Sequence, residues 1–379
     1  MSTQSLFAIV TGGGTAGHVA PALSVAQALV ARGHDPSTIH FGGAARGMEG
    51  TLVPEAGFGV TLLPGRGITR RLTFGAAKAN VAAVAGLSIA LLRAIAIVAR
   101  SRPRVVVSVG GYGSVPCTLA AALLRVPIVG VSYDAVPGAA SRLAGRLARA
   151  SAVAFAGSDL PRAVVTGTPV RPEVLAASRS AEGQARARSE LGLPSGRRVV
   201  AVTSGSLGAR RVNDAALGLA ERWSERSDLI LYHAVGRRDF PDVSRAASSL
   251  DERGLDYRTV AYEPHLPALL AACTVAVSRA GASTVAELTV LGAPSVLVPL
   301  PGAPSDHQTL NARKLAEAGA AVVLEDAECN AERLQAILED LLEDTQGLEQ
   351  MSGNAVGLGR RDAAELIAAL VDKHSKLAA

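Results

Sequence analysis

The sequence of 379 residues has few aromatic side chains and little cysteine. Phe, Trp and Tyr together make up 3% of the chain, so its cores must be built from Ala, Val and Leu within a hydrophobic content of 49%. The three cysteines, Cys117, Cys273 and Cys329, show no Cys-x-x-Cys or Cys/His spacing, which argues against a disulfide framework or a structural zinc site. The first residues have no basic segment leading into an apolar run, so we expect no signal peptide and a reducing cytoplasm.

Lysine is nearly missing, with 4 residues against 34 arginines, and the net charge is only +5. There is no long basic run and no basic patch interleaved with aromatics, so nucleic acid is not an expected partner. The arginine excess is compatible with phosphate-bearing partners and equally with a GC-rich genome. The length is large for one core and predicts two domains.

One apolar run, residues 79–99, carries a single charge, Arg93, and is long enough to span a bilayer. Its Ala, Val and Gly content favours a domain helix with one apolar face instead. The basic residues just ahead of it are Arg66, Arg70, Arg71 and Lys78. They are compatible with peripheral contact at an anionic leaflet, and equally with a solvated turn before a core helix.

Strand-like runs alternate with alanine-rich runs of helical length, which predicts an α/β fold with parallel sheets covered on both faces. The pattern breaks near residues 166–196, where we place the connection between domains. We expect two Rossmann-like domains facing a central cleft, with ligands outside the carboxyl ends of both sheets. The strands expected are 6–10, 38–41, 60–63, 104–109, 127–132 and 153–155, then 198–203, 229–234, 257–261, 275–278 and 295–298.

The first strand leads into the segment 11–21, Thr-Gly-Gly-Gly-Thr-Ala-Gly-His-Val-Ala-Pro. Glycines followed by a helix N-terminus suit a phosphate group. The spacing also fits the dinucleotide pattern G-x-G-x-x-G, but the second strand ends at 39–43, Ile-His-Phe-Gly-Gly, with no acid for the ribose between that end and Glu49, which disfavours a nicotinamide enzyme. A tight strand–helix turn would explain the glycines but not His18.

Three further junctions of this kind follow. Residues 110–114, Gly-Gly-Tyr-Gly-Ser, are either a close-packed turn or a ligand loop. Thr284 and Glu287 have the spacing of a capping box, which predicts a reciprocal helix cap. The alternative is that Glu287 binds ribose hydroxyls through its two oxygens. Residues 306–308, Asp-His-Gln, contact a sugar or only cap a helix.

Taken together, these motifs resemble the MurG family, the cell-wall N-acetylglucosaminyltransferases that make lipid II from lipid I in peptidoglycan synthesis. The shared motifs occur in family order over essentially the whole chain: 11–21, 110–112, 168–171 (Thr-Pro-Val-Arg), 279–287 and 306–308. The resemblance implies a GT-B fold, inversion at the anomeric carbon, and no bound metal or cofactor.

For the donor, the resemblance implies that UDP-N-acetylglucosamine binds a C-terminal domain, residues 168–352. Glu287 would contact the ribose and Gln308 the sugar, while Arg171 and the loop around Ser206 would stabilise the leaving diphosphate. The donor-binding residues that it implies are Arg171, Ser206, Asn213, Ala282, Thr284, Glu287 and Gln308.

For the acceptor, the resemblance implies a polyprenyl-diphosphate-linked sugar, lipid I, on an N-terminal domain, residues 1–167, to which the helical tail 353–379 returns. His18 would be the catalytic base or the group that orients the acceptor, because a helix N-terminus favours neutral imidazole. An apolar and basic patch would bind anionic inner-leaflet lipids, making the protein peripheral at the cytoplasmic face of the cell membrane. The acceptor-binding residues implied are Gly13, Gly14, Thr15, Gly17, Gly111, Tyr112 and Asp134.

The chain departs from the family at two places. Residues 131–134, Val-Ser-Tyr-Asp, stand where the family usually has His-Glu-x-Asn, so the carboxylate is displaced to Asp134. Leu207 replaces the usual glutamine, and Ser204 replaces a glycine. Two alternatives therefore stay open: a paralogue that glycosylates another lipid or a secondary metabolite, and an inactive donor-binding module.

Overall fold

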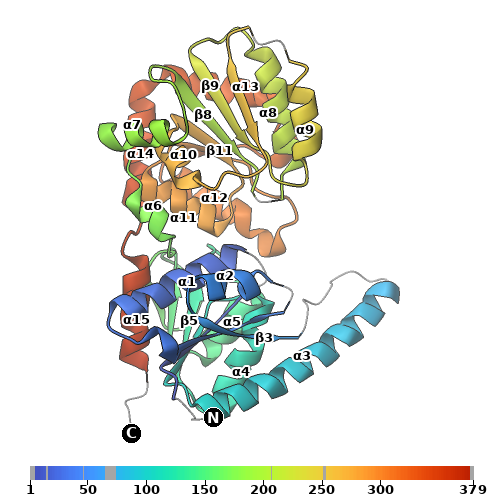
Figure 1. The fold of residues 1–379 in the computed structure, drawn as a ribbon, viewed down its shortest axis with the longest axis vertical. Helices are drawn as coiled ribbons and strands as arrows, with labels where there is room; N and C mark the ends of the chain where they lie inside the picture. Colours follow the sequence, from blue (N-terminus) through green and yellow to red (C-terminus); the bar gives the residue numbers. More distant parts are fainter. Residues whose placement is uncertain are drawn as a thin grey trace. The chain divides into compact units, whose positions relative to one another are not determined.

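The computed structural model describes residues 5–13, 16–45, 47–64, 74–205, 207–250 and 253–375, and the side chains of these residues except 16 and 74–85 (Figure 1). The chain divides into two compact units. Unit 1 comprises Met1–Arg171 and Arg361–Ala379, and unit 2 comprises Pro172–Arg360.

Unit 1 is built on a seven-stranded parallel sheet in the order β3-β2-β1-β4-β5-β6-β7. Its central strands are short, fully buried runs rich in Val and Ile, as is usual for parallel strands covered on both faces. The strands are β1 (Ala8–Thr11), β2 (Ile39–Ala44), β3 (Gly59–Leu63), β4 (Val105–Ser108), β5 (Ile128–Ser132), β6 (Ala150–Val153) and β7 (Ala163–Val165).

The last helix of the chain belongs to unit 1 and packs beside α1 (Figure 1). Arg32 Nε lies 2.6 Å from Asp372 Oδ2, and His34 Nε2 lies 2.7 Å from Asp372 Oδ1. The helices of unit 1 are α1 (Ala16–Ala31), α2 (Glu49–Glu55), α3 (Phe74–Ser101), α4 (Val115–Leu123), α5 (Ala139–Leu147) and α15 (Ala363–His374), with 3-10 turns η1 (Pro36–Thr38) and η2 (Tyr112–Ser114).

Unit 2 repeats the same arrangement with a six-stranded parallel sheet in the order β10-β9-β8-β11-β12-β13. Its strands are β8 (Arg198–Thr203), β9 (Leu229–Ala234), β10 (Asp256–Val260), β11 (Val275–Ser278), β12 (Ser295–Leu297) and β13 (Ala321–Val323). Its helices are α6 (Pro172–Ala176), α7 (Ala181–Glu190), α8 (Arg210–Arg222), α9 (Phe240–Ala247), α10 (Leu266–Ala272), α11 (Ala282–Leu291), α12 (His307–Glu317), α13 (Ala331–Glu343) and α14 (Thr345–Leu358), with 3-10 turns η3 (Pro304–Asp306) and η4 (Asp326–Glu328).

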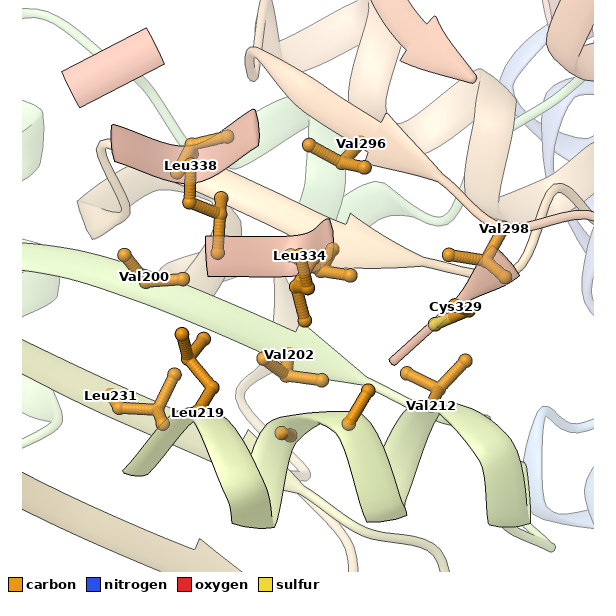
Figure 2. Packing of buried hydrophobic residues seen from close by; sticks show 14 of the residues in the cluster. Val200, Val202, Val212, Leu219, Leu231, Val296, Val298, Cys329, Leu334 and Leu338 are labelled. Carbon is orange, nitrogen blue, oxygen red and sulfur yellow. The ribbon is translucent and has the colours of Figure 1, made fainter. Parts of the chain in front are cut away.

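The core of unit 2 lies between its sheet and the helices α8 and α13 (Figure 2). Val202 of β8, Leu219 of α8 and Leu334 of α13 are each fully buried. Burying one such side chain contributes about 1.5–3 kcal/mol. This packing fixes β8 against α8 and so sets both ends of the loop at 204–209.

The predicted α/β class with two parallel sheets is confirmed, and the errors lie at sheet edges. The strand expected at 153–155 was placed to begin three residues too late and end two residues too late, because β6 runs from Ala150 to Val153. Two edge strands, β7 and β13, were not predicted at all. Each has only three residues, and all three of β7 are exposed. Neither strand is therefore long enough to show an alternation of apolar and polar residues in the sequence.

The apolar run 79–99 lies within α3. Ala90, Ala94 and Val98 are buried at helical spacing, whereas Ile89 and Leu92 are exposed, so the helix has one core-facing side. In the part of the chain that the structure describes, no helix has the length and apolar character needed to cross a bilayer.

Candidate functional site

In unit 1, the loops that follow β1 and β4 press against each other. A Cβ placed on Gly111 would lie 2.5 Å from the carbonyl oxygen of Gly13, and one on Gly12 would lie 2.0 Å from Cγ2 of Val109. Gly111 also has a φ of 74°, which other residues rarely adopt. Gly111 is thus required by the packing of one backbone on another, and Gly12 by the side chain of Val109; this packing brings Gly13 and Gly111 together.

Glu49, noted in the sequence only for its distance from the first glycine loop, lies directly against that loop. The side chain is 2% exposed, and its Oε1 accepts a hydrogen bond from the N–H of Ala44 at 3.1 Å. A Cβ on Gly13 would lie 1.4 Å from the same oxygen. The buried carboxylate therefore occupies the space that a side chain at residue 13 would need, a contact that sequence spacing did not reveal.

His18 lies in the first turn of α1 and faces residues from two other strand ends. Its ring centroid is 6.1 Å from that of Tyr133, in an edge arrangement with an interplanar angle of 64°. A Cβ on Gly110 would be 3.8 Å from Cδ2 of His18 and 3.1 Å from Oγ of Ser141. The carboxyl ends of β1, β4 and β5 thus gather an imidazole, a glycine turn, a phenol and a hydroxyl, and Ser141 had not been singled out.

Tyr133 is the buried member of this group, with 4% of its surface exposed. Among the described residues its hydroxyl has no hydrogen-bond partner. Burial raises the pKa of Tyr133 well above its usual value, and the charge of Asp134 adds to this, so the phenol stays protonated. Val131 and Ser132, at which the sequence departs from the pattern expected by resemblance, are buried inside β5, and Asp134 in the following loop is half-buried.

The remaining expected residues of the two sites are partly exposed or lie outside the described residues. Tyr112 is 37% exposed in the turn after β4, and Gly17 is exposed in the first turn of α1. Gly14, Thr15, Ser206, Arg66, Arg70 and Arg71 lie outside the described residues, as does the side chain of Lys78.

In unit 2, helix α11 begins immediately after the loop that follows β11. Its N-cap is Gly281, which makes no side-chain cap, so the capping-box alternative for Thr284 and Glu287 is wrong. Ala282 and Thr284 are instead half-buried residues of the first turn, where backbone N–H groups have no partner within the helix. Glu287, one turn further, is 7% exposed. A helix N-terminus of this kind favours anionic groups.

The loop before α12 has an unusual backbone. Ser305 and Asp306 both have positive φ, 57° and 51°, a conformation that costs on the order of 1–3 kcal/mol per residue. Gln308 follows, and its Oε1 accepts hydrogen bonds from the N–H groups of Ala280 at 3.2 Å and Leu300 at 3.0 Å. Gln308 thereby ties the loop after β11 to the loop after β12.

Arg279, the first residue after β11, joins a cationic group. Its Nη1 donates to Asp326 Oδ1 at 2.6 Å, and Nε of Arg211 lies 3.1 Å from Asp326 Oδ2. Both arginines and Arg210 line a hollow of about 590 Å³ at the carboxyl edge of the sheet. Three guanidinium groups against two carboxylates, those of Asp214 and Asp326, leave one excess positive charge in the lining, which suits an anionic ligand. The sequence placed Arg279 in a motif but gave no sign of Asp326.

Asn213, expected among the donor-binding residues, is 1% exposed, and its amide is fully occupied within unit 2. Oδ1 accepts from Ser204 Oγ at 2.5 Å and lies 3.0 Å from His233 Nε2. Nδ2 donates to the carbonyl oxygen of Val235 at 3.1 Å and to Asp239 Oδ2 at 3.0 Å. Any part that Asn213 has in ligand binding is therefore indirect. Arg171 is the last residue of the first segment of unit 1 and is half-buried.

Both units match domains of one known protein family. Residues 8–153 match the glycosyltransferase family 28 N-terminal domain, and residues 199–367 match the glycosyltransferase family 28 C-terminal domain. The chain is 38% identical over 376 residues to the UDP-N-acetylglucosamine--N-acetylmuramyl-(pentapeptide) pyrophosphoryl-undecaprenol N-acetylglucosamine transferase of Moorella thermoacetica, covering 96% of this chain and 98% of the relative. It is 35% identical over 373 residues to the protein of that name from Desulforudis audaxviator, covering 96% and 97%.

Among solved structures, MurG of Acinetobacter baumannii matches with a TM-score of 0.74 at 24% identity, covering 97% of this chain and 99% of that one. This chain belongs to the MurG family. It is accordingly a glycosyltransferase with the GT-B fold that the sequence predicted.

The MurG fold is shared with proteins of other kinds. The glycosyltransferase of kitacinnamycin matches with a TM-score of 0.70 at 18% identity, covering 98% of this chain and all of that one. Such a likeness concerns the fold alone. Within the MurG family, the segment 131–134 of this chain keeps a carboxylate only at Asp134.

Proposed function

We propose that this chain transfers N-acetylglucosamine from UDP-N-acetylglucosamine to the muramyl hydroxyl of lipid I, forming lipid II. The observation that carries the proposal is the match over 96% of the chain to relatives whose names state this transfer. The two sheets with glycine turns and helix N-termini at their carboxyl edges support it, because such edges bind phosphate-bearing ligands.

On the acceptor side, we assign the proton transfer to His18. The muramyl hydroxyl gives its proton to the neutral imidazole while its oxygen attacks the anomeric carbon, and the bond to UDP breaks on the opposite face, which inverts the configuration. The position of His18 beside Gly110, at the carboxyl edge of the sheet, supports this role. Gly13, Gly14, Thr15, Gly17, Gly111, Tyr112 and Asp134 would bind the acceptor around its diphosphate.

On the donor side, the leaving UDP carries the developing negative charge. The first turn of α11, with Ala282 and Thr284, offers backbone N–H groups to a phosphate, and Arg171 and Ser206 add to them without a metal. Glu287 would accept hydrogen bonds from the ribose hydroxyls. Gln308, held by the N–H groups of Ala280 and Leu300, would bind the sugar.

The experiment is a transfer assay with radiolabelled UDP-N-acetylglucosamine and three acceptors offered separately: a lipid I analogue, another polyprenyl-diphosphate sugar, and a small hydrophobic alcohol. Transfer to the lipid I analogue alone is the expected result. Transfer only to another acceptor would favour the paralogue alternative. The departure from the family pattern at Val131 and Ser132 is the observation that favours this alternative. UDP binding without transfer to any acceptor would favour the inactive module and contradict the proposal.

We also propose peripheral binding at the cytoplasmic face of the membrane. Ile89 and Leu92 of α3 are 49% and 69% exposed, and Leu123 of α4, which packs against α3, is 65% exposed. The exposed arginines on the same two helices and the turn that ends α4 are Arg93, Arg100 and Arg125. An apolar surface with cations beside it suits an anionic leaflet.

Cosedimentation with vesicles containing phosphatidylglycerol tests this surface. Leu92→Glu and Leu123→Glu should each reduce the bound fraction, whereas Val356→Glu, at an exposed position of α14 in unit 2, should not. Equal binding by all four proteins, or none by the wild type at low salt, would refute membrane contact through α3 and α4.

A further inference from the structure

The buried amide of Asn213 can have only one orientation. Its Nδ2 lies 3.1 Å from the carbonyl oxygen of Val235 and 3.0 Å from the ionised carboxylate of Asp239, and neither of these groups can donate. Oδ1 must therefore be the acceptor. Since Nε2 of His233 lies 3.0 Å from Oδ1, that nitrogen must carry a proton.

This requirement fixes the tautomer of His233. The residue is fully buried, and burial lowers its pKa to about 3, so the imidazole is neutral near pH 7. With Nε2 protonated, Nδ1 is the acceptor, and the hydroxyl of Tyr257 donates to it at 2.9 Å. Hydrogen bonds thus run in one direction, from Tyr257 through His233 to Asn213, across β10, β9 and α8.

The same network contacts Ser204 and Gly208, which lie near the two ends of the loop between β8 and α8. Oγ of Ser204 donates to Asn213 Oδ1 at 2.5 Å. A Cβ on Gly208 would lie 2.5 Å from Oδ2 of Asp239, and a Cβ on Gly236 would lie 2.2 Å from the nitrogen of Gly208. Ser204 is therefore fixed by a side-chain hydrogen bond, and Gly208 by contact with Asp239 and with the turn after β9.

We propose that Asn213 and His233 are positioning residues that hold Ser204 and Gly208, near the two ends of this loop, in the places that let the donor diphosphate bind there, without touching the donor themselves. The loop leads into the N-terminus of α8, so its shape decides where the free N–H groups of that helix point. The identity of the ligand as a nucleoside diphosphate rests on the proposed function, whereas the order of the loop does not.

The test compares full-length variants of His233. His233→Gln keeps an N–H that can reach Asn213, and His233→Leu removes it. Trp223→Phe is the matched control, because Trp223 is 1% exposed and loses a single hydrogen bond, from its Nε1 to Glu339 at 3.0 Å, at the other end of α8. Calorimetry with UDP measures binding, and amide hydrogen exchange of the peptide covering 204–209 measures loop order without ligand.

We expect His233→Leu to weaken UDP binding about tenfold, the equivalent of one lost hydrogen bond, and to speed exchange at 204–209. His233→Gln and Trp223→Phe should change neither. If His233→Leu does not fold, Tyr257→Phe should show both effects at smaller size. Equal effects in His233→Leu and Trp223→Phe, or unchanged exchange in His233→Leu, would overturn the inference. A wild type that binds no UDP would contradict the proposed function. Amide hydrogen exchange at 204–209 in the His233 variants would still show whether Asn213 and His233 order the loop.

Discussion

Gly111 is the residue at which backbone packing in unit 1 leaves least room. Alanine there meets two obstacles, the positive φ of 74° and the carbonyl oxygen of Gly13 at 2.5 Å from the new Cβ. Gly157 has a similar φ of 81° with nothing within 4 Å, so Gly157→Ala measures the conformational cost alone.

We therefore expect Gly111→Ala to lower the free energy of unfolding by more than the roughly 1 kcal/mol expected for Gly157→Ala, and to reduce kcat/KM for the acceptor. Denaturant unfolding and the transfer assay measure the two effects. Equal stability losses in the two variants would show that the loops after β1 and β4 separate at little cost.

Tyr133 gives a prediction of the opposite sign. Its buried hydroxyl has no hydrogen-bond partner among the described residues, and such a group costs about 1–3 kcal/mol. Tyr133→Phe should therefore raise the free energy of unfolding by about that amount while the ring still packs against His18. Tyr112→Phe, at a 37% exposed position, should leave stability unchanged. A loss of stability in Tyr133→Phe would mean that the hydroxyl is bonded.

At the scale of single residues, the sequence was informative where a residue follows a glycine turn. His18 could be singled out because an ionisable ring directly follows such a turn. The contacts of Tyr133 with His18, of Glu49 with Gly13 and of Asn213 with His233 could not be predicted, because each joins segments at least 20 residues apart in the chain. Asn213 itself was found only by family resemblance, which identifies a position but not whether its side chain faces ligand or core.

At the scale of elements, β9 carries a pH-sensitive group into the core of unit 2. His233 has an ordinary pKa near 6.5 when unfolded and a pKa of about 3 when folded, because burial disfavours its charged form. Between these values the unfolded chain binds the extra proton, so this residue lowers stability as the pH falls from 6.5 towards 3 by about 1.4 kcal/mol per pH unit.

Unfolding in urea at pH 7 and at pH 5 measures this dependence. We expect His233→Gln to lose less stability than the wild type over that interval, since glutamine does not titrate. His40, whose pKa burial also lowers, is unchanged in the variant and cancels in the comparison. Identical pH dependence in the two proteins would show that His233 does not stay buried and neutral.

Prediction from sequence also worked unevenly among elements. Buried central strands such as β8, β9 and β11 were placed to the residue, because a short Val-rich or Leu-rich run between turn signals is distinctive. The edge strands β7 and β13 lack such a signal. Helix α11 shows a different limit: the spacing of Thr284 and Glu287 allowed a capping box, and only the helix start at Ala282 rules it out.

At the scale of the whole molecule, the alternation of strands and helices was sufficient for the fold class, because few architectures accept it. The prediction of function depended on the ordered set of motifs, since each glycine turn alone occurs in many kinds of protein. The structure adds that several of these glycines are needed for packing between loops, so their presence alone does not indicate a ligand site in unit 1.

The most direct test of the account is transfer of radiolabelled N-acetylglucosamine from UDP-N-acetylglucosamine to a lipid I analogue by the wild type, His18→Ala and His265→Ala. His265 is an exposed histidine of unit 2 that pairs with Glu190 and controls for loss of an imidazole. We predict product from the wild type and His265→Ala, and a loss of about 100-fold or more in kcat for His18→Ala with UDP binding unchanged. Absence of product from the wild type, or full activity in His18→Ala, would contradict the account.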